Sequence, residues 1–411
     1  MMERSKYMSI PKVRFHGFKE KWREESLSKL FVERHEISTI TESLPQLSFT
    51  ISEGVIYPND RKSNKRDFLI KDITNKKYLV TYVGDIIYNP ANVIYGAIHR
   101  NSLCNGVVSP IYKIFKTEQD SNFMECVVRN PSFISQLSMK TEGTVTKLKT
   151  LKPESFLEMI VKIAPSIDEQ QKIASYFQSL DSLIQTTSKK LASLNLIKAA
   201  SLQSMFPQEG ETVPKVRFKG FEREWEPVKL SKIGYMTAGG TPSTFVDKYW
   251  NGEINWLQSG MVQNRIIYTS SVERKITAEG LSNSAAHMIK KDSVLIAITG
   301  ATCANIGYLT FESAANQSVV SIEPNNNFYS KFIYSSLISE RSQILSFKGG
   351  SAQSGVTLAN LKEILLKCPS FGEQVFIGDY FFSLEKNIEL LTQRLEKLKQ
   401  IKVACLDKMF V

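Results

Sequence analysis

Apolar side chains recur in alternating steps of four and three residues along two stretches, one in each half of the 411-residue chain. An apolar 4-3 repeat sustained over several heptads is typical of the seam of a coiled coil. The second stretch is uninterrupted, whereas the first has the polar Thr187 at one seam position. The seam residues are Ile173, Phe177, Leu180, Ile184, Leu191 and Leu194 in the first stretch and Ile377, Phe381, Leu384, Ile388, Leu391, Leu395 and Leu398 in the second.

Each stretch opens with a helix-start signal and closes on Met-Phe. Ser166 and Glu169 have the S-x-x-E spacing of a capping box, in which serine and glutamate satisfy backbone N–H groups reciprocally, and Ser370 and Glu373 repeat it. About 37 residues of helix would be roughly 55 Å long, too long to lie inside a small domain. Because both helices carry the same seam at the same length, we expect them to pack on one another; the alternative is that each packs on its own half.

The sequence outside the seams is also repeated. A leader of the form Pro-Lys-Val-Arg-Phe…Gly-Phe…Trp begins at Pro11 and recurs at Pro214. A Glu-Gln pair followed by Tyr-Phe opens both helices. Between leader and helix, residues 38–150 and 237–354 look unrelated at most positions. A shared frame with different inserts indicates one task performed on two different targets.

The inserts predict mixed domains of short strands. Residues 77–88 and 292–299 are rich in β-formers, and Gly, Asn and Pro separate such runs. We therefore predict an α/β (α+β) fold in which two mixed domains are each followed by a long helix. The predicted divisions are 1–165 for the first leader and domain, 166–206 for the first helix, 207–212 for a linker, 213–369 for the second leader and domain, and 370–411 for the second helix.

The composition indicates a folded protein with a polyanionic partner. Hydrophobic residues make up 42% and charged residues 23%, and the net charge is +11, which favours nucleic acid or an acidic surface. The five cysteines are scattered without a CxxC, which predicts reduced thiols and no zinc cluster. No signal-peptide pattern opens the chain, and no apolar run is long enough for a membrane span. We expect a cytoplasmic protein with no membrane association.

The sequence offers no catalytic constellation. Asn89-Pro90-Ala91-Asn92 lacks the aromatic residue that adenine methyltransferases stack on a flipped base. Gly239-Gly240-Thr241-Pro242 lacks the lysine and the following helix of a phosphate-binding loop. The four histidines are isolated from one another. We therefore expect no catalytic residues, no metal and no cofactor in this chain.

Basic and polar side chains in the two inserts remain as candidate DNA contacts. Lys and Arg suit phosphates, while Arg, Asn and Gln can also reach base edges in the major groove. For each single residue a solvated surface is the alternative, and Trp250 and Trp256 are expected in the core. The candidates are Arg61, Lys62, Lys65, Arg66, Lys76, Lys77 and Arg100 in the first insert and Thr241, Ser243, Lys248, Tyr249, Gln258, Ser259, Arg265, Lys290, Lys291 and Asn305 in the second.

Together these residues resemble a known family. The repeated leader, the run Gly-Gly-Thr-Pro-Ser from Gly239, the segments Tyr-Trp-Asn-Gly and Ile-Asn-Trp ending at Trp256, and the helix openings at Pro165 and Pro369 resemble the specificity (S) subunit of type I restriction–modification systems. The first insert departs from the pattern, with Val-Glu-Arg-His-Glu from Val32, so its recognition domain is expected to belong to another sequence class.

The resemblance implies a fold and a set of partners. Such subunits have two target-recognition domains, each followed by a long helix. They bind double-stranded DNA, two modification subunits that hold S-adenosylmethionine, and translocating restriction subunits that use ATP and Mg. The resemblance thus implies a non-catalytic, pseudo-twofold molecule with antiparallel helices. Unlike inserts would then read a bipartite, non-palindromic site.

Two alternatives stay open at this point. One is a DNA-binding subunit of a complex that only methylates, without restriction subunits. The other is a coiled-coil adaptor that joins proteins and has no specific affinity for DNA.

Overall fold

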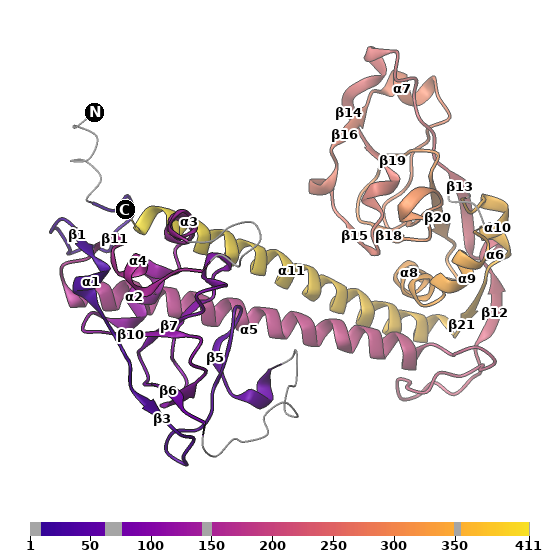
Figure 1. The fold of residues 1–411 in the computed structure, drawn as a ribbon. Coiled ribbons are helices and arrows are strands. Elements are labelled where there is room, and N and C mark those ends of the chain that lie inside the picture. The colour runs from indigo at the N-terminus through magenta and orange to yellow at the C-terminus, as the bar shows by residue number, and fades with distance from the viewer. Residues whose placement is uncertain (1–9, 62–75, 142–149, 349–354, 411) are drawn as a thin grey trace. The chain divides into compact units, whose positions relative to one another are not determined.

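The computed structural model describes residues 10–61, 76–141, 150–348 and 355–410 (Figure 1). The chain forms two compact units. Unit 1 comprises Met1–Thr186 and Glu396–Val411, and unit 2 comprises Thr187–Leu395. The division therefore falls inside the two long helices, α5 (Ile167–Met205) and α11 (Phe371–Met409). No helix in the described ranges is long and apolar enough to cross a lipid bilayer.

Unit 1 is a mixed α/β unit built from short strands. β1 (Arg23–Ser26) pairs with β11 (Ile160–Ile163), and a four-stranded sheet has the order β2-β10-β7-β8. Smaller sheets have the orders β3-β6-β9 and β4-β5. The remaining bounds are α1 (Leu27–Leu30), β2 (Phe31–Glu33), β3 (Ile37–Ser38), β4 (Ser48–Thr50), β5 (Gly54–Ile56), η2 (Pro58–Asp60), β6 (Tyr78–Thr81), β7 (Ile86–Tyr88), η4 (Val93–Tyr95), β8 (Ile98–Arg100), β9 (Gly106–Val108), β10 (Lys113–Thr117), α2 (Ser121–Val128), α3 (Pro131–Lys140) and α4 (Pro153–Leu157).

Unit 2 has the same frame around different sheets. β12 (Glu226–Lys229) pairs with β21 (Leu365–Cys368), a five-stranded sheet has the order β13-β20-β17-β18-β15, and a three-stranded sheet the order β16-β14-β19. The remaining bounds are α6 (Leu230–Ile233), β13 (Gly234–Ala238), η5 (Asp247–Tyr249), β14 (Trp250–Leu257), η6 (Ser259–Met261), β15 (Arg265–Ile267), η7 (Thr269–Ser271), β16 (Arg274–Ile276), α7 (Ala278–Ser282), β17 (Val294–Ala297), η8 (Gly300–Thr302), β18 (Ile306–Leu309), β19 (Ala314–Ala315), β20 (Val319–Pro324), α8 (Ser330–Ser339), α9 (Arg341–Ser346) and α10 (Leu358–Glu363).

An arginine of the leader fixes the start of each long helix. In unit 1 the Nε and Nη2 atoms of Arg14 donate to the two carboxylate oxygens of Glu169, at 2.6 and 2.7 Å. In unit 2 Arg217 and Glu373 repeat this bidentate pair at 2.7 and 2.8 Å. Both glutamates are buried. Their bond to the leader arginine was not predicted from the sequence, and the capping role of the two glutamates stays a prediction.

The glutamine that follows each glutamate holds a neighbouring helix. The carboxamide of Gln170 accepts from the backbone N–H of Asp120, the N-cap of α2, at 3.0 Å, and donates to the carbonyl of Ala164. Gln374 accepts in the same way from Tyr329, the N-cap of α8. The repeated Glu-Gln pair thus joins leader, long helix and domain in both units.

Each unit also contains the far end of the other half's helix. Met409 is part of the apolar core of unit 1, and Phe410 lies 5.8 Å from Trp22 between ring centroids. Met205 and Phe206 belong to the core of unit 2, where Phe206 lies 5.9 Å from Trp225. Burying a side chain of this size contributes roughly 1.5–3 kcal/mol, so these helix ends are integral to the units they enter.

The two long helices run antiparallel where they meet within each unit. In unit 1 the hydroxyl of Tyr176 contacts the Cys405 thiol at 3.3 Å, and the Lys402 ammonium pairs with Asp181. A residue later in α5 therefore pairs with a residue earlier in α11, as in an antiparallel pair. In unit 2 the equivalent contacts join Ser201 with Tyr380, at 2.9 Å, and Lys198 with Glu385, at 2.6 Å. The positions on α5 that make these contacts in unit 1 correspond to the positions on α11 that make them in unit 2, and the reverse also holds.

The predicted seam positions lie on the inner side of this packing. Within their units the following are buried: Ile173, Phe177, Leu180, Ile377, Phe381 and Leu384. The remaining seam residues are half-buried: Ile184, Leu191, Leu194, Ile388, Leu391, Leu395 and Leu398. Thr187, the polar interruption, is buried as well.

Removing the arginine should destabilise unit 2 strongly. We expect Arg217→Ala to lower the opening free energy of amides in α6 and the first turns of α11 by about 3–5 kcal/mol, because it leaves the buried Glu373 carboxylate without its partner. Hydrogen–deuterium exchange of the full chain measures this. Lys275→Ala is the matched control, since Glu253, its partner at 4.0 Å, is 98% exposed. An effect of Arg217→Ala no larger than the control's would contradict this account.

Candidate nucleic-acid interface

A tightly packed loop follows β13 in unit 2. The N–H groups of Gly239 and Gly240 donate to the carbonyls of Val319 and Ala315, at 2.9 and 2.8 Å. A Cβ on Gly239 would lie 2.2 Å from the Ala315 carbonyl oxygen, and one on Gly240 would lie 2.2 Å from the backbone of Ala285. Any side chain would displace the loop, so both glycines are required by the close backbone approach.

Two tryptophans hold the rest of this loop. The indole N–H of Trp256 donates to the carbonyl of Gly240, and that of Trp250 donates to the carbonyl of Ser243, both at 3.0 Å. The rings meet edge to face at 5.1 Å, and the Arg274 guanidinium lies 4.0 Å above Trp250. Both tryptophans are buried, as the sequence predicted. They are therefore supports of the loop and not stacking platforms for bases.

The outer side of the loop carries polar and aromatic groups. Thr241 is half-buried and its hydroxyl donates to Gln317, whereas Ser243 is exposed. Phe245 is 96% exposed. Lys248 is exposed beside the half-buried Tyr249, and its ion pair with Glu279 raises the pKa of the Lys248 ammonium. This lysine is therefore charged at neutral pH.

Other candidates of unit 2 are also at the surface. Gln258 is exposed and Ser259 is half-buried, at the start of η6. Lys290 pairs with Glu323 at 3.0 Å, and Lys291 lies 4.0 Å from Asp292. Both lysines are exposed. Exposed ion pairs contribute roughly 0–1 kcal/mol, so a phosphate could replace either carboxylate at little cost.

Two candidates of unit 2 have internal partners. Arg265 is half-buried beside Glu389 of α11; burial raises the pKa of the Glu389 carboxyl, and the charge of Arg265 opposes this. The Oδ1 atom of Asn305 accepts from Arg341 at 3.1 Å and from Asn264 at 3.3 Å. Asn305 thus bonds side chains of its own unit and Arg265 lies near a carboxyl of α11, and the contact of either residue with DNA stays a prediction.

Some of the candidate DNA contacts of unit 1 are exposed. Arg61, Lys76 and Lys77 are exposed, and the Lys76 ammonium lies 5.6 Å from the centre of the Tyr78 ring. Lys62, Lys65 and Arg66 lie outside the described residues.

Arg100 has an internal role. Its Nε atom lies 3.7 Å from a carboxylate oxygen of Glu125, and its side chain is largely buried. Burial opposes the charge of Glu125, but the hydrogen bond with His99 and the charge of Arg129 outweigh it and lower the pKa of that carboxyl. Arg100 thus belongs to a charged cluster that ties β8 to α2, and its contact with DNA stays a prediction.

The described ranges contain no group of three or more His, Cys, Asp or Glu side chains placed to hold a metal ion. The polar groups of unit 2 can instead form hydrogen bonds and ion pairs with a ligand. Exposed lysines beside a rigid loop are suited to a polyanion such as the DNA backbone.

Sequence reasoning missed several residues that build this site or the frame around it. Arg274 was not singled out, because nothing near it in the sequence shows that it lies over two tryptophans. Phe245 could have been found as an aromatic residue within a polar, Pro-containing loop. Arg14 and Arg217 were noted only as part of the repeated leader. Their recurrence in both halves was the signal that could have indicated a structural role.

Comparison with known proteins agrees with this geometry. Residues 222–400 match the sequence model of the family described as type I restriction modification DNA specificity domain. The MjaIX type I restriction enzyme specificity subunit of Methanocaldococcus jannaschii is 29% identical over 43% of this chain and 42% of its own length. The EcoR124I/EcoR124II specificity subunit of Escherichia coli is 29% identical over 42% of this chain and 44% of its own length. The chain thus spans less than half the length of these curated relatives.

The fold is similar as well. The S subunit of a type I restriction–modification system from M. genitalium has a TM-score of 0.65 at 14% identity, covering 98% of this chain and 99% of that one. Residues 222–400 thus resemble the type I restriction modification DNA specificity domain, and the fold of the chain is similar to that of an S subunit. The resemblance inferred from the sequence is confirmed.

Losing one indole N–H should loosen the glycine loop. We expect Trp256→Phe to lower the opening free energy of the Gly239 and Gly240 amides by about 1–2 kcal/mol, because the Gly240 carbonyl loses its buried donor. Hydrogen exchange at these two amides is the measurement. Trp250→Phe is the control, since its N–H bonds the other end of the loop. Equal effects of the two changes would argue against this role of Trp256.

Proposed function

We propose that this chain is the DNA-recognition subunit of a type I restriction–modification complex. Each mixed domain reads one half of a bipartite, non-palindromic site, and the chain docks two modification subunits. The observation that carries this proposal is the repeated frame around unlike domains. Arg14–Glu169 and Arg217–Glu373 make the same contact, whereas the sheets between them have the orders β2-β10-β7-β8 and β13-β20-β17-β18-β15.

A subunit that presents two different surfaces in the same way suits a target with two different halves. The proposed arrangement is pseudo-twofold, with α5 and α11 as an antiparallel coiled coil that separates the two readers. Half-sites about one helical turn apart, roughly 34 Å, would place both readers on one face of the duplex. The antiparallel contacts within each unit support this arrangement.

The chemistry is proposed to reside in the partners. The modification subunits would supply S-adenosylmethionine, and restriction subunits would supply ATP-driven cleavage with Mg. This chain would then contribute recognition and positioning, with no catalytic group of its own. The exposed Lys248, Lys290 and Lys291, on a chain with net charge +11, support contact with a polyanion.

Methylation mapping tests this function. We expect DNA from cells that express the chain with its modification subunit to carry one new motif of two unlike half-sites around a fixed spacer. Replacing residues 237–354 with the insert of another family member should change one half-site only. A change in both half-sites would refute the modular reading. No new methylation, despite an assembled complex, would refute the recognition function.

The dependence of DNA binding on salt tests individual lysines. Binding that neutralises phosphates weakens as salt is added. The slope of log K against log salt is about −0.9 per phosphate contact. We therefore expect Lys291→Ala to make the slope of log K against log salt less negative by about 1. Lys29→Ala, an exposed lysine of α1 outside both inserts, should leave the slope unchanged. Equal slopes for both variants and the parent chain would exclude Lys291 as a phosphate contact.

A further inference from the structure

Four segments of unit 2 meet at one edge of its sheets. Residues 239–244 follow β13, 258–264 join β14 to β15, 298–305 join β17 to β18, and 316–318 join β19 to β20. β13 and β17 both run antiparallel to β20, so their last residues lie beside its first ones. β14 and β19 run parallel and end together. We call these four segments the polar edge of unit 2.

Backbone hydrogen bonds join the segments of the polar edge to one another. The N–H of Asn316 donates to the carbonyl of Leu257, and the N–H of Ile298 donates to the carbonyl of Ser318, both at 2.9 Å. The bonds of the two loop glycines to β19 and β20 add to these. The polar edge is therefore a rigid support that holds an exposed side chain at a defined place.

The side chains of the polar edge can form hydrogen bonds but carry no charge. None of the four segments contains Asp, Glu, Lys, Arg or His, although charged residues make up 23% of the chain. Threonine, serine, asparagine and glutamine occur in them instead. Such groups are suited to base edges, whose donors and acceptors are also uncharged. The exposed Lys248, a few residues beyond the first segment, supplies positive charge for a phosphate.

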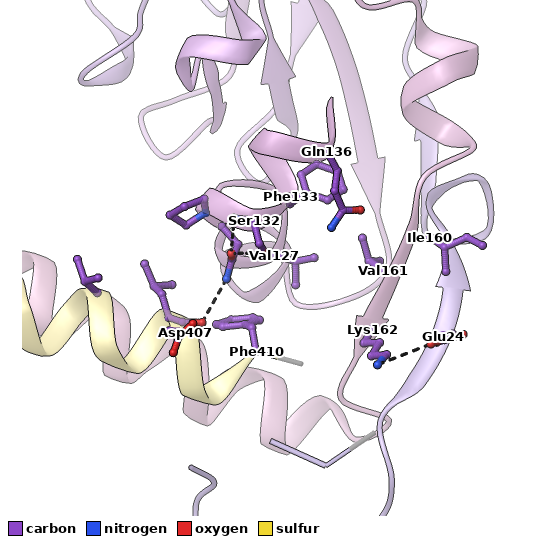
Figure 2. A pocket seen from close by; sticks show the side chains of 14 residues that line it. Glu24, Val127, Ser132, Phe133, Gln136, Ile160, Val161, Lys162, Asp407 and Phe410 are labelled. Atoms are coloured by element: carbon purple, nitrogen blue, oxygen red, sulfur yellow. Dashed lines mark hydrogen bonds and ion pairs between the residues drawn. The ribbon is translucent and has the colours of Figure 1, made fainter. Parts of the chain in front are cut away.

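The pocket of unit 1 has a different chemistry. It encloses about 560 Å³ between α3, β11 and the end of α11. Figure 2 shows the apolar Phe133 and Val161 lining it, with the ion pair of Glu24 and Lys162 at one side. An apolar wall and an ion pair do not match the uncharged donors and acceptors of a base edge, whereas the polar edge of unit 2 does.

One carboxamide of the polar edge is both exposed and oriented. Gln317 is exposed in the turn between β19 and β20, and its Oε1 atom accepts from the hydroxyl of Thr241 in the glycine loop. In the described part of the chain this is the one bond that the carboxamide makes, so a lone pair of Oε1 and both N–H groups are available. Fixing a glutamine side chain costs rotamer entropy, and the bond to Thr241 lowers that cost before a ligand binds.

We propose that Gln317 reads an adenine in the half-site of unit 2. In the major groove adenine presents N7 as an acceptor and its N6 amino group as a donor, and a glutamine carboxamide can pair with both. The Nε2 atom of Gln317 donates to N7, and its Oε1 atom accepts from N6. Thr241 is the positioning residue that keeps the carboxamide in this orientation. That the ligand is DNA rests on the proposed function.

Selection from DNA with randomised half-sites tests this role. The full chain would be assembled with its modification subunit, and the methylated molecules would be sequenced. We expect Gln317→Ala to reduce the preference for adenine at one position of one half-site by roughly five- to one-hundredfold, as for one lost bidentate contact. Gln393→Ala is the matched control, because Gln393 is also exposed and also bonds one side chain, that of Glu389 on α11. It should leave the motif unchanged.

A base analogue and two threonine variants identify the contact. At the affected position, 7-deazaadenine lacks N7 and should weaken DNA binding by the parent complex roughly two- to tenfold, as for one lost hydrogen bond. It should not weaken binding by the Gln317→Ala complex any further. Thr241→Val removes the hydroxyl and should reduce the preference for adenine, whereas Thr241→Ser should retain it.

Hydrogen exchange at the Gly239 and Gly240 amides should be the same in Gln317→Ala as in the parent chain, which excludes a disturbed loop. An unchanged preference with Gln317→Ala, a loss of preference at several positions, or an affected position that does not carry A·T would overturn the inference. If the parent complex still methylated one bipartite motif in those cases, the proposed function would stand. A parent complex without any sequence preference would instead refute the proposed function itself.

Discussion

The ion pair between each leader arginine and the glutamate at the start of each long helix is the contact on which the frame depends. Arg14 and Glu169 are distant in sequence, and the glutamate is nearly inaccessible to water. A buried carboxylate is tolerated only with a partner and good geometry, which the bidentate guanidinium provides. The same arginine also donates to a leader carbonyl, at Glu20 in unit 1 and at Arg223 in unit 2. It therefore sets the course of the leader and the helix together.

The leader is also where the other half's helix is held. The N–H of Val13 donates to the carbonyl of Lys408 at 3.0 Å, and the N–H of Val216 donates to Ser204 at 2.9 Å. Each leader thus binds the start of one long helix and the end of the other. Because the Met-Phe ends lie in the apolar cores, neither unit is complete with its own half of the sequence alone. This exchange explains why leader, helix start and helix end recur while the inserts are free to differ.

The frame could be predicted from the sequence because its signals are local or repeated. The 4-3 apolar pattern gave the long helices, and α5 and α11 have 39 residues each. The role of Glu169 could not be predicted, because the same local sequence is compatible with a capping box and with a partner 155 positions away. The sheets of the inserts were beyond prediction for a similar reason, because β13 pairs with β20 and β14 with β19, far along the chain.

Recognition residues were the hardest to predict, because a basic side chain can be exposed at the surface or can pair with a carboxylate in the interior. Lys248 and Arg100 look alike as sequence, yet one is exposed beside Glu279 and the other ties β8 to Glu125. What distinguishes them is whether the neighbouring carboxylate is desolvated. An exposed ion pair can exchange its carboxylate for a phosphate at little cost, whereas a buried one cannot release its arginine without leaving a charge unpaired. Tertiary burial therefore decides which cations are available to DNA, and it depends on contacts that the linear order of residues does not show.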